Sequence, residues 1–273
     1  MKALITGANG MLGQDLSPIL EDEGYEVIET DVDSMDITDI NSVKKVLTTE
    51  KPDIVFHCAA WTNVDKAEED PKGAELINFK GTENVAKICS QLDITIVYIS
   101  TDYVFDGEKP ETEFYTPSDK TNPLSVYGKT KLMGEQAILN NCKKHYIVRT
   151  SWLYGINGKN FVETMLSLKD KPEIKVVNDQ RGCPTWTIEL ANALVKIVNM
   201  PFGIYHACGS KSTTWYEFAK EIFSLSNLNV NLLPCKTEEF PRLAKRPKNS
   251  AMNNNKICRD WKLALKDYLL LRD

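Results

Sequence analysis

Tyr127 and Lys131 form the pair of side chains in this sequence that is best suited to chemistry. They stand four positions apart, so on a helix they share one face. A phenol has a pKa of about 10, and an ammonium beside it stabilises the phenolate and lowers that pKa. Tyr127 can then pass a proton to a carbonyl oxygen while a hydride reaches the carbon, and Lys131 can hold the ribose hydroxyls of a nicotinamide cofactor. The pair predicts an enzyme that moves a hydride to or from an alcohol or ketone carbon.

A hydroxyl at a strand end distinguishes this pair from a second pair with the same spacing, Tyr216 and Lys220. The apolar stretch 94–100 predicts a buried strand that leads into Thr101. Ligands of open parallel sheets bind beyond the carboxyl ends of the strands, so the Thr101 hydroxyl can bond the same substrate oxygen as the first pair. No such hydroxyl precedes Tyr216, whose ring we interpret as part of helix packing. The predicted catalytic residues are therefore the first pair and Thr101.

A glycine-rich turn follows the first predicted strand, residues 2–6, and leads into a predicted helix over 11–23. Its glycines, Gly7, Gly10 and Gly13, have the spacing G-x-x-G-x-x-G. Glycines permit a tight turn and a close approach of the backbone to a pyrophosphate. The start of a helix adds free N–H groups and a partial positive charge. This order of strand, turn and helix predicts the binding site of a dinucleotide.

Asp31 stands at the end of the second predicted strand, 18 residues after Gly13. A carboxylate there accepts hydrogen bonds from the adenosine ribose and repels a 2′-phosphate. No arginine occurs in the glycine-rich turn or among residues 30–40. These features favour NADH as the cofactor, and a solvated turn acid is the alternative interpretation of Asp31.

Composition and charge narrow the classes of function. The chain has 273 residues, 42% hydrophobic content and a net charge of −5, which fit a globular protein with a sizeable core and disfavour nucleic-acid binding. The seven cysteines contain no C-x-x-C pair, and the three histidines show no ligand spacing, so we expect reduced thiols and no metal site. No apolar run approaches 18 residues, and no targeting segment is visible, so we expect no membrane association and a cytoplasmic location. The sequence leaves a homodimer open.

Alternating strand and helix patterns up to residue 150 predict an α/β fold, a doubly wound parallel sheet of Rossmann type with right-handed crossovers. We expect residues 1–150 to form a dinucleotide-binding domain. Residues 151–273 are expected to form a smaller substrate-binding lobe, some of whose elements return to the main sheet. The stretch 230–256 is rich in Pro, Asn and Lys and is predicted to be largely irregular, and the loop 107–123 is a candidate rim or lid.

Several motifs resemble those of the extended short-chain dehydrogenase/reductase superfamily and, within it, the dTDP-4-dehydrorhamnose reductase family. They lie in family order along nearly the whole chain, which makes them far more specific together than any one alone. In chain order they are Ala59-Ala60-Trp61-Thr62-Asn63-Val64-Asp65-Lys66-Ala67-Glu68, Ser100-Thr101-Asp102-Tyr103-Val104-Phe105, Tyr127-Gly128-Lys129-Thr130-Lys131, Arg149-Thr150-Ser151-Trp152, Asp179-Gln180, Pro184-Thr185, Arg246-Pro247 and Ser250.

The resemblance implies reduction of the C4 ketone of dTDP-4-dehydro-L-rhamnose to dTDP-L-rhamnose, with Tyr127 as the proton donor assisted by Lys131 and Thr101. The resemblance also weakens the expectation that NADH is the sole cofactor, because enzymes of this family often accept NADPH as well. Together with the glycine-rich turn and Asp31, the predicted cofactor-binding residues are Gly7, Gly10, Met11, Leu12, Gly13, Asp31, Asp36, Ile37, Ala59, Ala60, Thr62, Tyr127 and Lys131. The substrate-binding residues that it implies are Thr62, Val64, Thr101, Asp102, Tyr103, Trp152 and Arg246.

Other functions within and beyond the superfamily stay open at this point. A 4-epimerase uses the same Tyr–Lys pair and retains its NAD, whereas a reductase releases it. A 4,6-dehydratase is disfavoured, because it is expected to follow the strand-end Thr with an Asp-Glu pair and here Asp102 is followed by Tyr103. A non-catalytic regulatory role is also open, since the β-subunit of methionine adenosyltransferase resembles this family and retains much of the Tyr–Lys segment.

Overall fold

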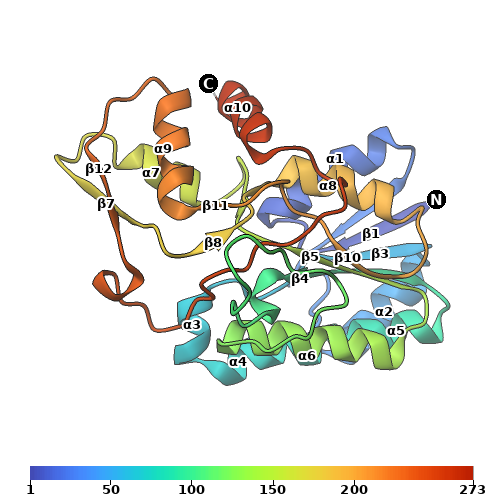
Figure 1. Cartoon of the computed structure of the whole chain (residues 1–273). Coiled ribbons are helices and arrows are strands. Elements are labelled where there is room, and N and C mark those ends of the chain that lie inside the picture. Colours follow the sequence, from blue (N-terminus) through green and yellow to red (C-terminus); the bar gives the residue numbers. More distant parts are fainter. Residues whose placement is uncertain (273) are drawn as a thin grey trace.

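Six parallel strands form the central sheet in the computed structural model of the protein, which describes residues 1–272. Their order across the sheet is β10-β5-β4-β3-β1-β2 (Figure 1). Every neighbouring pair runs parallel, so the carboxyl ends of all six strands meet at one edge. The strands are β1 (Lys2–Thr6), β2 (Glu26–Thr30), β3 (Ile54–His57), β4 (Thr95–Thr101), β5 (His145–Thr150) and β10 (Gly203–His206).

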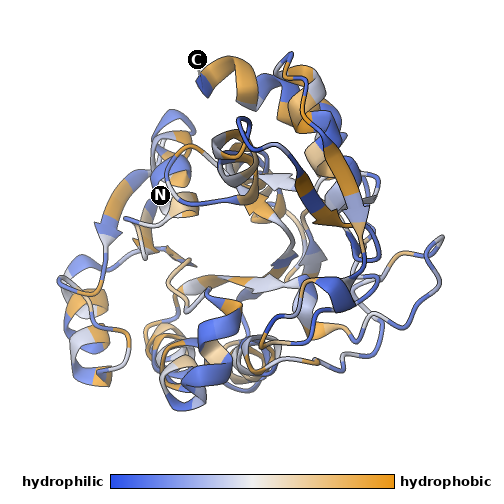
Figure 2. Ribbon diagram, turned by 90° about the vertical axis from the view of Figure 1, so that its left-hand side faces the viewer, coloured by the Kyte–Doolittle hydropathy of each residue, from blue (hydrophilic) through white to orange (hydrophobic). Residues whose placement is uncertain are grey.

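Helices cover both faces of this sheet, as a doubly wound fold requires. On one face α1 (Met11–Asp22) packs beside α8 (Thr187–Ile197), and on the other lie α2 (Ile40–Glu50), α5 (Thr82–Gln91) and α6 (Val126–Asn141). Figure 2 shows the sheet running between these two layers. Because both faces are buried, the strands are apolar along most of their length rather than alternating.

The strands divide their side chains between two cores. In β1, Ala3 and Ile5 belong to the core beneath α1 and α8, whereas Leu4 belongs to the core beneath α2, α5 and α6. Burial of these apolar side chains favours folding by about 25 cal/mol for each Å² removed from water. The two cores hold the carboxyl edge of the sheet in a fixed position.

The stretch 72–92 is helical, and its hydrogen-bond register changes partway along. α4 (Pro71–Glu75) passes into a π-helical segment, η1 (Leu76–Gly81), before α5 begins. Within η1 the buried Asn78 amide bonds both the N–H and the C=O of Trp61 and also the Thr130 hydroxyl. Because π segments re-aim single side chains and occur often at functional sites, η1 ties the segment after β3 to the helix that carries Tyr127.

A third core lies in the C-terminal half of the chain and is rich in aromatic rings, including Tyr154, Phe218 and Trp261. Three sheets of two strands accompany it. The remaining elements, which include the short helices between β3 and α6, are α3 (Val64–Glu69), η2 (Asp102–Val104), β6 (Leu153–Tyr154), α7 (Phe161–Ser167), β7 (Ile174–Val177), β8 (Arg181–Gly182), β9 (Thr185–Trp186), β11 (Thr213–Thr214), α9 (Trp215–Leu225), β12 (Leu232–Cys235), η3 (Thr237–Glu239) and α10 (Trp261–Arg272).

The predicted α/β class with a parallel sheet is confirmed. The C-terminal half supplies β10, which pairs with β5 at the edge of the main sheet. Within the stretch predicted to be largely irregular, β12 pairs in parallel with β7. The division into domains at residue 150 stays a prediction. Within residues 1–272, no helix is both long and apolar enough to cross a membrane.

Candidate active site

A crevice of about 910 Å³ lies at the carboxyl ends of strands β1 to β5. This is the edge at which open α/β sheets bind their ligands. Most of the predicted site residues line it, namely Gly7, Gly10, Met11, Leu12, Gly13, Asp31, Asp36, Ile37, Ala59, Ala60, Thr62, Thr101, Asp102, Tyr127, Lys131 and Trp152. Three predicted substrate residues, Val64, Tyr103 and Arg246, lie outside that lining.

The glycine-rich turn brings the backbone of the chain close to the segment after β3. Gly7 has a φ of +66°, in the left-handed region, and a Cβ there would lie 2.8 Å from Ala59 Cα. Glycine thus avoids both backbone strain and a clash. Gly10 is the N-cap of α1 and offers no side chain to the first-turn N–H groups. The turn therefore presents uncapped N–H groups to the crevice, which suits an anion such as a diphosphate.

Two carboxylates are fixed at the β2 end of the crevice. Asp31 accepts hydrogen bonds from the backbone N–H groups of Asn9 (3.0 Å) and Val32 (2.8 Å). Asp36 accepts from both the N–H and the hydroxyl of Thr38. Since these bonds hold the carboxylates in place, they can receive ribose hydroxyls at this end of the crevice.

Tyr127 lies in the first turn of α6, whose N-cap Ser125 accepts a hydrogen bond from Gly128 N. The pKa of Tyr127 is raised to about 12, mainly by burial and also by the nearby Asp102, against the lowering effect of the Thr101 hydroxyl. The direction is opposite to the lowering that the sequence argument expects, because loss of water disfavours the phenolate. The phenol is therefore protonated at neutral pH.

Lys131 lies deeper in the protein than Tyr127. Its Nζ donates to the backbone oxygen of Ile99 at 2.6 Å and sits 4.1 Å from the centre of the Tyr98 ring. Burial lowers the pKa of Lys131 to about 7, while Glu135 and Cys58 counteract this fall. The amine is thus anchored to β4 at the bottom of the crevice and titrates near neutrality.

Thr101 and Asp102 turn the chain from β4 into η2. The Thr101 hydroxyl donates to Asp102 Oδ1 at 3.1 Å, and Tyr103 N donates to Thr101 Oγ1 at 3.2 Å. Ser250 Oγ donates to Asp102 Oδ2 at 2.5 Å. Burial raises the pKa of Asp102 to about 7, against the lowering effect of these hydroxyls. A titratable carboxyl therefore sits directly beside the predicted catalytic hydroxyl.

A buried ion pair lies below the Tyr–Lys pair. Arg149 of β5 donates through Nε and Nη2 to the two oxygens of Glu135 in α6, at 2.8 and 2.7 Å. Ser100 Oγ donates to the same carboxylate at 2.5 Å. Because both charged groups are almost fully buried, their pairing fixes the position of α6 against β4 and β5.

Arg246 is engaged with an acid beside the crevice. Its two terminal nitrogens contact the two oxygens of Asp65 at 2.5 and 2.8 Å, and Ala244 N donates to the same carboxylate. Arg246 also lowers the pKa of Tyr103, although burial raises that pKa overall. The Tyr103 ring in turn meets the Tyr127 ring edge-on at 5.8 Å. Arg246 thus contacts both Asp65 and Tyr103, and Tyr103 contacts the crevice residue Tyr127, although Arg246, Asp65 and Tyr103 do not line the crevice.

Trp152 forms the crevice wall after β5. Its φ of +49° is unusual for a residue with a side chain, and its ring stacks on Trp215 at 3.5 Å with an interplanar angle of 6°. The indole also lies against Gly182, where any Cβ would clash with it. These contacts hold the Trp152 ring in one orientation, which suits it to pack against a sugar.

The sequence analysis assigned no site role to several polar residues found here, although Thr150, Ser151 and Ser250 stand in the family-like motifs. Thr150 and Ser151 line the crevice after β5, and Lys159 lines it from a loop. Thr150 pairs in register with Thr101, so the strand-end rule could have found it. Its buried Oγ1 has no hydrogen-bond partner in the part of the chain that the structure describes. Ser250 reaches Asp102 only through the fold, so its motif did not indicate this contact, and no local signal marks Lys159.

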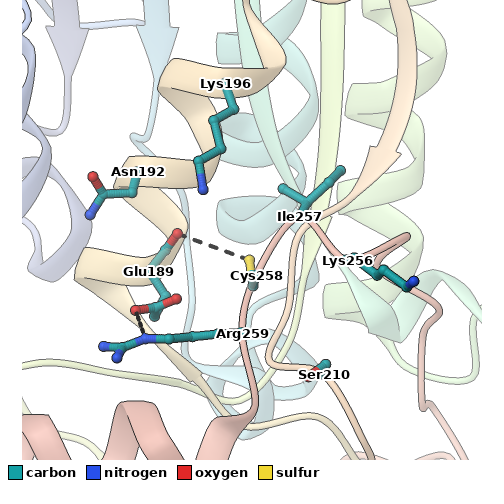
Figure 3. Close-up of a pocket in the computed structure, with 8 residues that line it drawn as sticks. All are labelled: Glu189, Asn192, Lys196, Ser210, Lys256, Ile257, Cys258 and Arg259. Atoms are coloured by element: carbon teal, nitrogen blue, oxygen red, sulfur yellow. Dashed lines mark hydrogen bonds and ion pairs between the residues drawn. The ribbon is translucent and has the colours of Figure 1, made fainter.

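A second hollow, of about 520 Å³, lies between α8 and the segment before α10 (Figure 3). Arg259 bonds Glu189 there at 2.6 Å, and Cys258 Sγ faces the Glu189 backbone oxygen. The guanidinium also pairs with Asp267. None of the predicted site residues lines this hollow, so the crevice at the sheet edge is the candidate active site.

Known proteins resemble the chain over its whole length. The family model described as the RmlD substrate binding domain matches residues 1–270. A dTDP-4-dehydrorhamnose reductase of Aggregatibacter actinomycetemcomitans is 39% identical, over 97% of each chain.

Two solved structures have nearly the same fold. A dTDP-4-dehydrorhamnose reductase of Clostridium acetobutylicum ATCC 824 is 47% identical with a TM-score of 0.95, over 99% of each chain. One of Bacillus anthracis str. Ames, in complex with NADP, is 41% identical with a TM-score of 0.95, also over 99% of each chain. By sequence, fold and the layout of its crevice, the chain belongs to the dTDP-4-dehydrorhamnose reductase family.

Proposed function

We propose that this chain reduces the C4 ketone of dTDP-4-dehydro-L-rhamnose to dTDP-L-rhamnose with a nicotinamide cofactor, with Tyr127 as the proton donor. The observation that carries the proposal is the convergence of Tyr127, Lys131 and Thr101 on a crevice that also holds the glycine-rich turn. The names of the relatives specify the substrate class. The family membership makes the chain an oxidoreductase that acts on a sugar nucleotide.

The crevice fits a dinucleotide at both of its ends. Uncapped N–H groups of α1 suit the diphosphate, and Asp31 suits the adenosine ribose. A reduced nicotinamide, when bound, supplies the hydride that becomes the new hydrogen on C4. Lys131 would hold the ribose at the nicotinamide end, where its amine is anchored by Ile99 O.

Tyr127 donates the proton in the proposed reaction. With its pKa raised to about 12, the phenol carries its proton at neutral pH and can donate it to the C4 oxygen. Thr101 orients that oxygen from the end of β4. Once the proton has left, the Thr101 hydroxyl, which already lowers the pKa of Tyr127, would stabilise the phenolate by turning its hydrogen away from Asp102. Lys131, when protonated, adds a positive charge on the same helix face.

We assign the substrate contacts to other residues that line the crevice and to predicted residues beside it. Trp152, held flat by Trp215, would face the sugar, and Asp102 and Thr62 would bond its hydroxyls. Val64, Tyr103 and Arg246 are retained as predicted substrate residues, although they lie outside the crevice lining. Their roles therefore rest on the family resemblance alone.

We also propose NADH as the preferred cofactor. Asp31 places a negative charge where a 2′-phosphate would lie, which disfavours NADPH. The B. anthracis relative was solved with NADP, so acceptance of both cofactors is expected with different affinities.

The test is oxidation of NADH by the purified protein, with dTDP-4-dehydro-L-rhamnose generated in the same tube by its upstream enzymes. Loss of reduced-cofactor absorbance in step with formation of dTDP-L-rhamnose is the expected result. Binding of NADH without turnover would contradict the proposal. Interconversion of sugars without net loss of NADH would indicate an epimerase instead.

A further inference from the structure

Residues 155–160, here called the strap, lie over the start of α1. Asn157 Nδ2 donates to Asp15 Oδ1 of α1 at 2.9 Å, and Thr187 of α8 donates to the other oxygen of Asp15. A Cβ on Gly158 would lie 3.5 Å from Met11 Cβ, the first residue of α1. The strap is therefore held against the helix that follows the glycine-rich turn.

Hydrogen bonds also hold the C-terminal end of the strap. Asn160 Nδ2 donates to Gly155 O at 2.7 Å and to Gly158 O at 3.2 Å, which closes the strap on itself. Asn160 is also the N-cap of α7, where its Oδ1 accepts from Glu163 N. Lys159 thus sits between two anchored residues, and it lines the crevice.

Lys159 differs from the other residues that line the crevice in its exposed positive charge. Among the lining residues of the described chain, 1–272, the cations are Lys131 and Lys159. Lys131 is buried and bonded to Ile99 O. Lys159 is exposed, and in that same part of the chain its ammonium has no carboxylate partner. Among the described lining residues, Lys159 therefore supplies the exposed ammonium, and its neighbour Gly158 lies where α1 begins.

We propose that Lys159 binds the diphosphate of the nicotinamide cofactor, and this inference rests on the function proposed above. The diphosphate carries two negative charges, and residues 7–13 contribute backbone N–H groups but no basic side chain. Lys159, whose neighbour Gly158 lies next to Met11, supplies the missing positive charge. An ammonium suits this task as a point charge on a flexible stem.

The experiment measures affinity by titration calorimetry for NADH, NADPH, ADP-ribose and dTDP, with Lys159→Met as the variant. Lys169→Met is the matched control, because Lys169 is also exposed and unpaired within the described residues but does not line the crevice. We expect Lys159→Met to weaken the three diphosphate-containing adenosine ligands equally, by about threefold to tenfold. The affinity for dTDP should be unchanged. The difference from wild type should shrink at high salt, because exposed charges are screened.

Each alternative pattern overturns the inference. Weaker binding of NADPH alone would place Lys159 at the 2′-phosphate, and weaker binding of dTDP alone would place it at the sugar nucleotide. Equal affinities in Lys159→Met and wild type, with cofactor bound by both, would remove Lys159 from binding and leave the proposed function standing. Wild-type protein that binds neither NADH nor NADPH would overturn both.

Discussion

Ser250 donates a hydrogen bond of 2.5 Å to Asp102, although 148 positions separate the two residues. The other oxygen of Asp102 accepts from Thr101. A residue near the end of the chain thus holds the carboxyl that lies beside the proposed catalytic hydroxyl. The carboxyl is buried, and its pKa is raised to about 7.

Asp102→Asn should stabilise the free protein at pH 8. The pKa of this carboxyl is about 7 in the fold and about 3.9 in an unfolded chain. Between these values the folded protein retains a proton that the unfolded chain has lost, so raising the pH from 4 to 8 destabilises the fold. The loss of unfolding free energy attributable to this one group is roughly 4 kcal/mol.

Urea denaturation of the wild type and of Asp102→Asn at pH 5 and pH 8 measures the unfolding free energies that test this prediction. The variant should gain stability relative to wild type as the pH rises, with the difference levelling off above the pKa of Asp102. Equal pH dependence in the two proteins would show that Asp102 titrates normally.

Tyr127→Phe should lower turnover by about 10²–10⁴-fold, because the variant lacks the proton donor. Affinity for the cofactor should stay similar. Tyr216→Phe serves as the control, since Tyr216 packs against the third core away from the crevice, and it should be kinetically silent. Steady-state rates and calorimetric cofactor affinities check both statements. Near-normal turnover in Tyr127→Phe would remove this residue from the acid role.

Asp31→Asn should shift cofactor choice toward NADPH. The amide keeps the shape of the side chain while removing the charge that repels a 2′-phosphate. We expect the ratio of kcat/KM for NADPH to that for NADH to rise about tenfold, the size of one lost charged hydrogen bond together with relieved repulsion. An unchanged ratio would mean that Asp31 contacts only the backbone of Asn9 and Val32.

Glu135→Gln should destabilise the protein by about 3–5 kcal/mol, because it leaves the buried Arg149 guanidinium without its charged partner. Glu83→Gln is the control. Glu83 pairs with Lys80 and Lys87 on the surface, where a salt bridge contributes about 0–1 kcal/mol. Thermal or urea unfolding of the two variants measures the contrast. Similar losses in both would mean that the Glu135–Arg149 pair contributes no more than a surface pair.

Local rules account for the parts of the site that sequence could predict. Gly7 and Asp31 follow strands and Thr101 ends one, and the strand-end rule of parallel sheets brings such residues to one edge. Tyr127 and Lys131 were readable because helical spacing alone puts them on one face. Each of these inferences needs only the identity of one element and its direction.

The rest depends on contacts between distant segments. Ser250 reaches Asp102 from the far end of the chain, and no periodicity around Ser250 indicates that contact. The rise in the pKa of Tyr127 comes from burial by several elements, so the spacing of Tyr127 and Lys131 gave the wrong direction. Similarly, the strand β12 forms through pairing with β7, although its own sequence contains a proline and is largely exposed.

The pairing of β10 with β5 has a consequence for synthesis on the ribosome. Residues 203–206 supply the strand that covers the outer edge of β5. Until they have emerged, the nascent chain exposes the backbone N–H and C=O groups of β5 to other chains, which is the arrangement that promotes edge-to-edge aggregation. A ribosome that stalls after residue 150 would therefore display five of the six strands with the edge of β5 unpaired, so the newly made protein has most need of a chaperone while residues 151–206 are being translated.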